Sequence, residues 1–168
     1  MGSAPRAVDL VLGGWKTAGV WSLHSGFPLQ FTVENGGSPI WTYGPQRPNI
    51  TGTPRRSGGP ESNWINNYFA NPAVFQLPPA YTLGDTPRAI GGVRSPLNLT
   101  NNLSIMKDFG LSSRHKEMQF EVRLEAENAL NHPVFGTPDT IVGDPSFGAI
   151  SYMGVGPRQC QLALKLYF

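Results

Sequence analysis

Strict alternation of apolar and polar side chains is the main pattern of this chain, and it is clearest at residues 158–168, which read RQCQLALKLYF. One parity carries Cys160, Leu162, Leu164, Leu166 and Phe168, and the other carries Gln, Ala, Lys and Tyr. Successive side chains of a β-strand point to opposite faces, so this segment predicts a strand with one apolar and one polar face. Its length matches the roughly 9–11 residues of a strand that crosses a bilayer. The pattern therefore predicts a membrane β-barrel strand.

Three other segments, near 12–34, 97–109 and 117–128, show the same alternation. In 12–34 the odd positions stay mostly apolar from Trp15 to Val33, which favours one long strand with room for a bend at Gly26–Pro28. The segment 117–128 is the clearest of the three, because its even positions from Met118 to Ala126 are apolar and its odd positions are charged or amide side chains. A helical period would mix charge into the apolar stripe there, so the strand interpretation is preferred.

Two side chains interrupt the apolar face of the segment 97–109. Lys107 lies near the strand end, where its long stem could carry the charge to the membrane interface. Asn101 has no such explanation and counts against a membrane strand.

Two long segments without a sustained period, 35–96 and 131–157, separate these strands, and a short polar turn joins the second strand to the third. Outer-membrane barrels have long external loops and short periplasmic turns, so the order of loop lengths fits four antiparallel strands of an all-β barrel. Both long segments are therefore expected to be outer loops. We expect the longer loop to pack on itself through Trp64, Tyr68, Phe69, Phe75 and Tyr81.

The composition of the chain excludes several classes of function. Charged residues make up only 14% of the 168 residues, against roughly 25% in soluble domains. The net charge is +2 and no basic run is longer than Arg55–Arg56, so the chain lacks the charge pattern of a nucleic-acid-binding protein. The single cysteine, Cys160, allows no disulfide within the chain. The first residues have no signal-peptide pattern, so we expect a targeting segment upstream.

Candidate catalytic and metal-binding groups are scattered along the chain. His24, His115 and His132 have no metal-ligand spacing, and Ser25 beside His24 lacks the glycine-flanked turn of a serine nucleophile. Glu121, Glu125 and Glu127 share one strand face, where wet lumen residues are a better explanation than a glycosidase carboxylate pair. We therefore expect no catalytic, cofactor-binding or metal-binding residues, and we expect that the protein is not an enzyme.

Several pieces of the sequence, in order, carry a family resemblance. They are LGGWKTAGVWSLHSGFPLQFTV, RPNITG, ANPAVFQLP, LGDTPRAIGGVRSPLNLTNNLSIMKDFGL, MQFEVRLEAENALNHPVFGTP, and FGAI followed by GPRQCQLALKLYF. This ordered set, which covers most of the chain, resembles the C-terminal barrel portion of TonB-dependent outer-membrane receptors of the Oar-like group, whose members carry a carboxypeptidase-regulatory-like domain.

The resemblance implies a place in the bacterial outer membrane and a role in energy-coupled uptake of a solute. Such receptors resemble barrels of about 22 strands, and four strands cannot close a barrel, so we expect a C-terminal segment that is inactive alone. The implied partners are outer-membrane lipid, the rest of the barrel and its plug domain, TonB through the missing N-terminal part, and the barrel assembly machinery. The assembly signal read by that machinery would be Phe168, Leu166 and Leu164.

Two groups of residues are candidates for contact with the solute. Glu121, Arg123 and Glu125 on the polar face of the third strand would face the barrel lumen. Trp41, Tyr43 and Trp64 in the longer loop would belong to the outer mouth. The alternative is a soluble β-sandwich binding module, in which the apolar strand faces pack on each other and these three aromatic residues stack on a carbohydrate.

Overall fold

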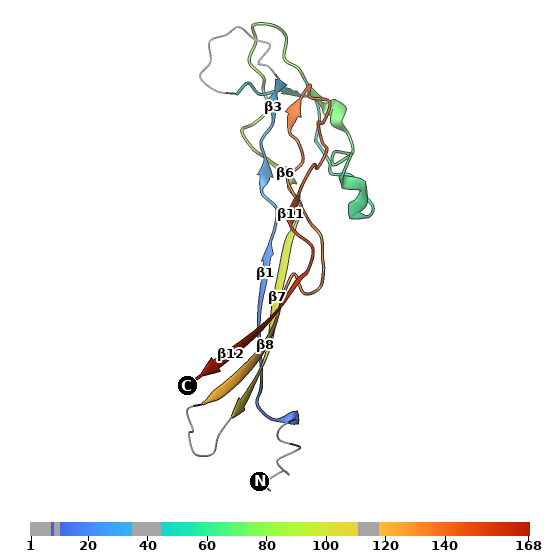
Figure 1. Ribbon diagram of the computed structural model, residues 1–168. Coiled ribbons are helices and arrows are strands. Elements are labelled where there is room, and N and C mark those ends of the chain that lie inside the picture. The colour runs from blue at the N-terminus through green and yellow to red at the C-terminus, as the bar shows by residue number, and fades with distance from the viewer. Residues whose placement is uncertain (1–7, 9–10, 35–44, 111–117) are drawn as a thin grey trace. The chain divides into compact units, whose positions relative to one another are not determined.

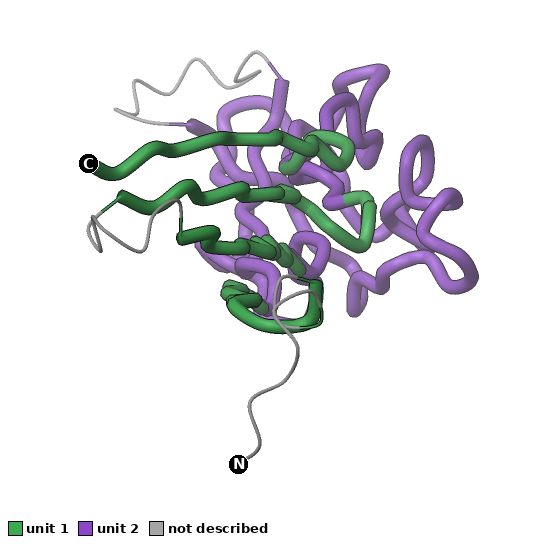
Figure 2. The backbone as a smooth tube through the Cα atoms, turned by 60° about the horizontal axis from the view of Figure 1, so that its bottom comes forward, with its two compact units in different colours: residues 1–23, 99–133, 155–168 green, residues 24–98, 134–154 purple. Residues whose placement is uncertain are grey.

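The computed structural model of the chain describes residues 8, 11–34, 45–110 and 118–168 (Figure 1). The chain divides into two compact units, drawn in different colours in Figure 2. The sheet unit consists of residues 1–23, 99–133 and 155–168, and the loop unit consists of residues 24–98 and 134–154. Each unit is built from segments far apart in the sequence.

The sheet unit contains one four-stranded sheet with the strand order β1-β7-β8-β12. Its strands are β1 (Trp15–His24), β7 (Asn98–Gly110), β8 (Gln119–Glu127) and β12 (Gln159–Tyr167). The pairs β7–β8 and β8–β12 are antiparallel. Sequence alternation predicted strands near 97–109, 117–128 and 158–168, close to where β7, β8 and β12 lie.

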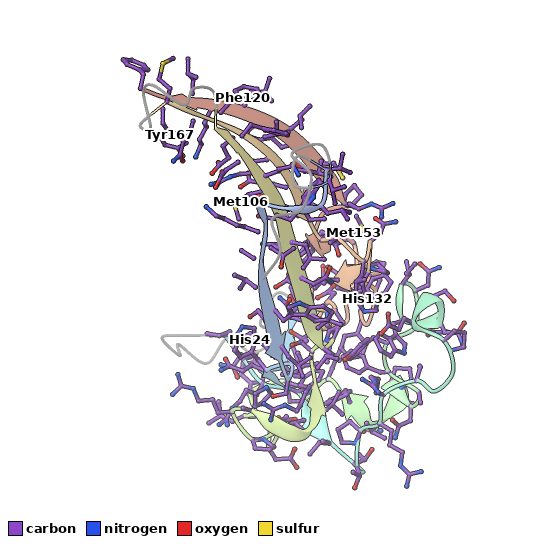
Figure 3. All side chains as sticks on the ribbon, turned by 90° about the horizontal axis from the view of Figure 1, so that it is seen from below. His24, Met106, Phe120, His132, Met153 and Tyr167 are labelled. Atoms are coloured by element: carbon purple, nitrogen blue, oxygen red, sulfur yellow. The ribbon has the colours of Figure 1, made fainter. Side chains whose placement is uncertain are left out.

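The strand register brings the apolar positions into rows across the sheet. Leu124 lies opposite Ile105 on one side and Leu162 on the other, and Phe120 lies opposite Phe109 and Leu166. A slip of one residue would move every apolar side chain to the other face, so the alternation itself selects this register. Side chains project from both faces of the strands, as the labelled Phe120 and Met106 illustrate (Figure 3).

The prediction of one long strand near 12–34 was wrong. The strand β1 ends at His24, and two short strands follow, β2 (Pro28–Leu29) and β3 (Thr32–Val33). The alternation continues past His24 because Leu29, Phe31 and Val33 are buried against protein within the loop unit. Alternation in the sequence shows that one face of a strand is apolar, but it does not show whether that face contacts a protein core or lipid.

The described parts of the segments predicted as outer loops, 45–96 and 131–157, contribute most of an ordered core. The described residues of the loop unit contain four short strand pairs. The pairs β2–β6 and β4–β5 are antiparallel, and the pair β3–β10 is parallel. The fourth pair is β9–β11. The additional elements are β4 (Asn49–Ile50), η2 (Glu61–Trp64), η3 (Pro72–Val74), β5 (Phe75–Gln76), β6 (Ile90–Arg94), β9 (Val134–Phe135), β10 (Ile141–Val142) and β11 (Met153–Val155).

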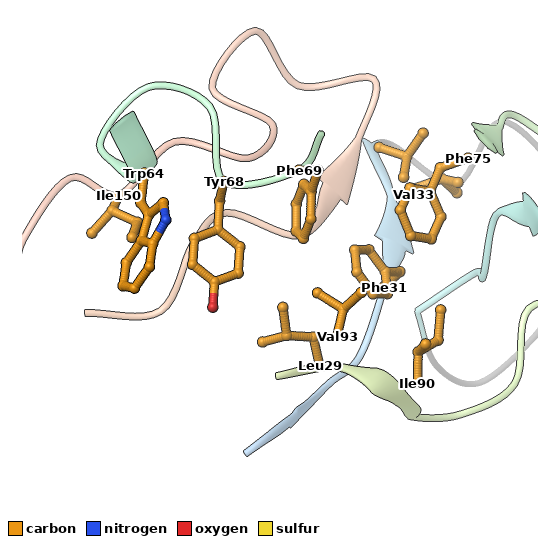
Figure 4. Packing of buried hydrophobic residues seen from close by; sticks show 11 residues of the cluster. Leu29, Phe31, Val33, Trp64, Tyr68, Phe69, Phe75, Ile90, Val93 and Ile150 are labelled. Atoms are coloured by element: carbon orange, nitrogen blue, oxygen red, sulfur yellow. The ribbon is translucent and has the colours of Figure 1, made fainter. Parts of the chain in front are cut away.

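Aromatic rings form the centre of the loop unit (Figure 4). The ring centroid of Phe31 lies 4.1 Å from that of Phe75 and 5.4 Å from that of Phe69, and Phe69 stacks on Phe147 at 5.2 Å. Of the five aromatic residues expected to pack the longer loop on itself, Trp64, Tyr68, Phe69 and Phe75 are buried, whereas Tyr81 is 71% exposed. Burial of these large rings removes apolar area from water and so stabilises this set of short strands.

Candidate functional site

The polar face of the sheet carries a chain of ion pairs. On β8 the Arg123 guanidinium donates to the Glu121 carboxylate at 3.1 Å and to the Glu125 carboxylate at 3.3 Å. These three side chains alternate along the strand, so all point to one face. On the neighbouring strands the Lys16 ammonium pairs with the Asp108 carboxylate. The sheet thus brings together the three residues predicted from sequence to face a lumen.

Glu121 is the most enclosed member of this chain of charges, since the residue is only 7% exposed. The register places Glu121 between Asp108 of β7 and Lys165 of β12. A carboxylate removed from water needs a cation and hydrogen bonds, and Arg123 provides both through the geometry of its guanidinium group. The carboxylates of this face therefore serve ion pairing. Further along the face, a shallow depression of about 320 Å³ is lined by Ser104, Glu125, Glu127, Gln159 and Gln161, among others.

The opposite face of the sheet is apolar and remains uncovered by the described residues. Its exposed side chains come from all four strands: Trp15, Trp21, Leu23, Leu103, Ile105, Leu124, Leu162, Leu164 and Leu166. Contiguous apolar surface on this scale is rare on monomeric soluble proteins and marks contact with another apolar phase or partner. A β-sandwich would instead pack this face against a second sheet.

Lys107, which interrupts the apolar face, is 5% exposed. Its ammonium group donates to the backbone carbonyls of Val11 at 3.1 Å and Gly13 at 2.8 Å. It also lies 4.7 Å from the ring centroid of Trp15 and 5.4 Å from that of Phe109. The charge is thus satisfied within the sheet unit by carbonyl oxygens and aromatic faces.

Asn101, the other interruption, belongs to an asparagine cluster made of Asn101, Asn102, Asn128 and Asn131. The Asn101 side-chain oxygen accepts from the Leu130 amide at 2.7 Å, and the Asn102 side-chain oxygen accepts from the Asn128 amide at 3.1 Å. These bonds attach β7 to the turn that follows β8. Asn101 is therefore fully buried against this turn, where its side-chain oxygen is bonded and its side-chain nitrogen has no hydrogen-bond partner. It contacts protein and not lipid, so it does not argue against a membrane strand.

The rest of the asparagine cluster attaches the same turn to the approach to β12. The Asn128 side chain donates to the carbonyls of His132 and Gly156 at 3.0 and 3.1 Å, and the Asn131 side-chain oxygen accepts from the Arg158 amide at 3.0 Å. Asn128 and Asn131 have φ values of 48° and 53°, in the left-handed region that Asn tolerates better than other residues except glycine. The cluster positions three of the four strands.

Of the three aromatic residues predicted for an outer mouth, Trp64 is the only one within the described residues, and it is buried. Trp64 is only 6% exposed and packs in the core of the loop unit, with the Arg56 guanidinium 4.5 Å from its ring centroid. It is therefore a core residue and cannot stack on a ligand as predicted, because neighbouring side chains already cover its ring. Trp41 and Tyr43 lie outside the described residues.

The loop unit contains a pocket that sequence reasoning missed. Its volume is about 280 Å³, and its lining includes His24, Phe27, Ser95, Asn98, Phe135 and Tyr152. The side-chain oxygen of Asn98 is buried without a hydrogen-bond partner. Phe27 and Tyr152 are 72% and 55% exposed, so aromatic surface is available at the pocket. No periodic signal could have found it, because its residues come from four separate segments.

Two tyrosines of the loop unit have shifted acidity. Burial raises the pKa of the Tyr68 hydroxyl, although the nearby Arg56 guanidinium opposes the shift, and this hydroxyl donates to the Arg94 carbonyl. At the pocket, hydrogen bonds from the Thr137 hydroxyl and amide to the Tyr152 oxygen lower the pKa of Tyr152. These shifts follow from local hydrogen bonding and burial.

Within the described parts of the chain, no group of three or more His, Cys, Asp or Glu side chains is arranged to hold a metal ion. A search of the same residues finds no helix long and apolar enough to cross a membrane.

A sheet with one exposed apolar face, one ion-paired polar face and antiparallel strands of 9–13 residues defines a class of protein, the β-barrels of membranes. Residues 1–161 match the family model of the outer membrane beta barrel domain. The chain therefore belongs to this family and is a protein of the bacterial outer membrane. Comparisons with curated proteins and with solved structures gave no match.

Family membership agrees with the all-β fold of antiparallel transmembrane strands predicted from the sequence. It argues against the alternative of a soluble β-sandwich. A sandwich would place a second sheet over the apolar face, and the described residues form no such sheet. The match is to the barrel domain in general.

Proposed function

We propose that this chain is part of a TonB-dependent transporter of the Oar-like group, which takes up a solute across the outer membrane. The ordered sequence pieces that resemble this group support the proposal, as does membership of the outer membrane beta barrel family. A large ordered unit between barrel strands also favours a receptor over a simple pore, because a receptor must build a binding surface outside the membrane.

The observation that carries the proposal is the division of the sheet into two chemically distinct faces. We assign the apolar face, with Leu162, Leu164 and Leu166, to contact with outer-membrane lipid. We assign the polar face, with Glu121, Arg123 and Glu125, to the barrel lumen. Because Arg123 occupies both neighbouring carboxylates, we propose that the face guides a solute without converting it chemically.

In this proposal the loop unit belongs to the outer mouth of the transporter. Its pocket, with exposed Phe27 and Tyr152, is the place where a solute would first be held. Aromatic surface combined with a few polar groups is the usual composition of a small-molecule site. The pocket takes the role that the sequence had suggested for Trp64, which is buried.

The remaining partners follow from the class of transporter. We propose that a plug domain and a TonB-contacting segment belong to the intact protein, and that further strands pair with the edges β1 and β12 of the sheet. An open edge in lipid would leave backbone amides and carbonyls unsatisfied at several kcal/mol each. The residues Phe168, Leu166 and Leu164 would form the signal for the barrel assembly machinery.

The proposal is tested by solute depletion in the native bacterium. Strains lacking this gene, lacking TonB, or lacking neither are grown in defined medium, and the loss of solutes from the medium is followed by mass spectrometry. We expect at least one solute whose depletion is lost in both deletion strains. A solute profile that changes on loss of this gene but not of TonB would overturn the assignment.

Two complementing variants separate the pocket from general surface effects. We expect Tyr152→Ala to reduce uptake of that solute, whereas Tyr81→Ala should leave uptake unchanged. Both tyrosines are more than half exposed, and Tyr152 lines the pocket. The amount of each variant in the outer-membrane fraction must match the wild type. Equal uptake by the two variants would contradict the role of the pocket.

A further inference from the structure

The described residues directly before β1 expose apolar side chains that neither the sheet nor the proposed transport explains. Val11 and Leu12 are 63% and 73% exposed, and only residues 13 and 14 separate them from Trp15 at the start of β1. Val11, Leu12 and Trp15 therefore form an apolar stripe at this end of the strand.

Trp15 connects this stripe to the apolar face of the sheet. Its indole nitrogen donates to the Val11 carbonyl at 2.9 Å, and its side chain lies on the same face of the sheet as Lys107 and Phe109. Trp15 is itself 55% exposed. Tryptophan favours the boundary between hydrocarbon and head groups, because its ring is apolar and its N–H is a donor.

Lys107 holds the stripe in this position. Its ammonium group donates to the carbonyls of both Val11 and Gly13, so one cation ties two backbone carbonyls before β1 to β7. A lysine with only 5% exposure is a costly choice on an apolar face unless its charge has such partners. The contact fixes where the stripe leaves the sheet.

The most suitable occupant of this stripe is a lipid surface. The stripe is continuous with the apolar face of strands from an outer-membrane barrel family, and it lies at a strand end, beside a Trp and a Lys. An apolar stripe flanked by these residue types is the composition of segments that lie in the interface plane of a membrane. A protein partner would not require the stripe to be continuous with the apolar face of the sheet, whereas a lipid surface would contact both.

We propose that Val11 and Leu12, continued by Trp15, form an interfacial anchor that inserts into the head-group boundary of the outer membrane's phospholipid, with Lys107 as its positioning residue. The inference rests on the proposed contact of the apolar face with lipid. It is independent of the transported solute and of TonB. The anchor fixes the depth of the sheet in the bilayer at the end where β1 begins.

Three exposed leucines allow a matched test by spin labelling of the full chain in phosphatidylethanolamine–phosphatidylglycerol vesicles. In a Cys160→Ser background, a nitroxide label is attached to a cysteine that replaces Leu12, Leu164 or Leu77, which are 73%, 62% and 58% exposed. Collision with oxygen reports the lipid phase, and collision with a water-soluble nickel chelate reports the aqueous phase. We expect the oxygen-to-nickel ratio at Leu12 to resemble that at Leu164 and to exceed that at Leu77 several-fold.

Each other pattern overturns the proposal in a distinguishable way. A ratio at Leu12 like that at Leu77, with Leu164 still in lipid, removes the anchor and leaves the lipid contact of the sheet intact. Water-like ratios at both Leu12 and Leu164 remove the lipid contact as well. A Leu12 label shielded from both reagents indicates a protein partner on the stripe.

A second variant tests the role of Lys107. The substitution Lys107→Met keeps the apolar stem and removes the ammonium donor, and circular dichroism checks that the strand content is retained. We expect the label at Leu12 to become more mobile and its oxygen-to-nickel ratio to fall, while the label at Leu164 does not change. An unchanged signal at Leu12 would contradict the positioning role.

Discussion

At the scale of single residues, close approaches of the backbone decide which side chains the loop unit accepts. The chain at Gly26 passes so near β6 that a Cβ there would lie 1.7 Å from the Ser95 carbonyl oxygen. Two hydrogen bonds hold this approach together. The Phe27 amide donates to the Ser95 hydroxyl, and the Ser95 amide donates to the Phe27 carbonyl. Glycine is required at Gly26 because no side chain fits.

Substitution of this glycine gives the first prediction. We expect Gly26→Ala to destabilise the loop unit by about 1–3 kcal/mol, because backbone must move to admit a methyl group. Gly91→Ala is the matched control, since nothing lies within 4 Å of its Cβ position. Urea unfolding in detergent micelles, followed by tryptophan fluorescence, measures both. Equal midpoints for the two variants would show that the contact at Ser95 relaxes easily.

Asn128 provides the second prediction at this scale. We expect Asn128→Ala to cost about 2–4 kcal/mol, since it removes three side-chain hydrogen bonds worth about 0.5–1.5 kcal/mol each. It also places alanine at a φ of 48°. Asn128→Gly loses the same bonds without the conformational cost, so it should be less destabilising by about 1 kcal/mol. If glycine were as stable as asparagine in urea unfolding, the hydrogen bonds would not stabilise the turn.

At the scale of the elements, β8 is the strand on which the polar face depends. It pairs with β7 on one side and β12 on the other, and it carries both carboxylates that bind Arg123. The two ion pairs differ in exposure, because the Glu121 side chain is 9% exposed and the Glu125 side chain is 35% exposed. Water screens the second pair more than the first.

A double-mutant cycle on β8 tests this difference. We expect Arg123→Met to be destabilising, mainly because it leaves the Glu121 carboxylate enclosed and without its cation. The measured coupling of Arg123 with Glu121→Gln should exceed its coupling with Glu125→Gln, because water screens the more exposed pair. The cycle is measured by urea unfolding in micelles. Equal couplings would indicate that water reaches both pairs alike.

At the scale of the whole molecule, the two units bury their apolar residues in different ways. The loop unit has an aromatic core of its own around Phe31, which is 2% exposed. The sheet unit instead leaves its apolar side chains outside, as expected for strands of an outer-membrane barrel family. Stability of the loop unit therefore depends on internal packing, whereas the sheet depends on its surroundings and its hydrogen bonds.

Removal of one core ring tests this separation. We expect Phe31→Ala to destabilise the loop unit by about 3–5 kcal/mol, because a cavity forms among Phe69, Phe75 and Phe147. Limited proteolysis with mass spectrometry should then cut residues 45–98 and leave β7, β8 and β12 protected. Phe27→Ala, at a residue 72% exposed, is the control and should match the wild type. Simultaneous cleavage of both units would show that they unfold together.

The two faces of the sheet could be predicted from the sequence because alternation is a local property. In β8 and β12, odd and even positions point to opposite faces of the sheet, so the position number of a residue gives its face. The rows of apolar side chains then select the register between the strands. The ion pairs of Arg123 were predictable for the same reason, since its partners lie two residues away on the same strand.

The loop unit could not be predicted in this way. Leu29, Phe31 and Val33 alternate as a membrane strand does, yet they are buried in protein. The aromatic residues that surround Phe31 come from segments that have no period, and the pocket near Tyr152 combines four separate segments of the chain. Trp64 was misassigned because an aromatic residue in a polar loop has the same sequence signature whether it is buried or exposed.

By itself, the sequence determined that the chain forms two-faced antiparallel strands, because strand geometry converts parity directly into sidedness. It also determined which of those faces is apolar and which carries the charges around Arg123. Only the tertiary structure decided that Asn101 and Asn128 join three strands, that Lys107 holds the residues before β1, and that the intervening segments share an aromatic core. Those features depend on contacts between residues far apart in the chain, and no local period records such contacts.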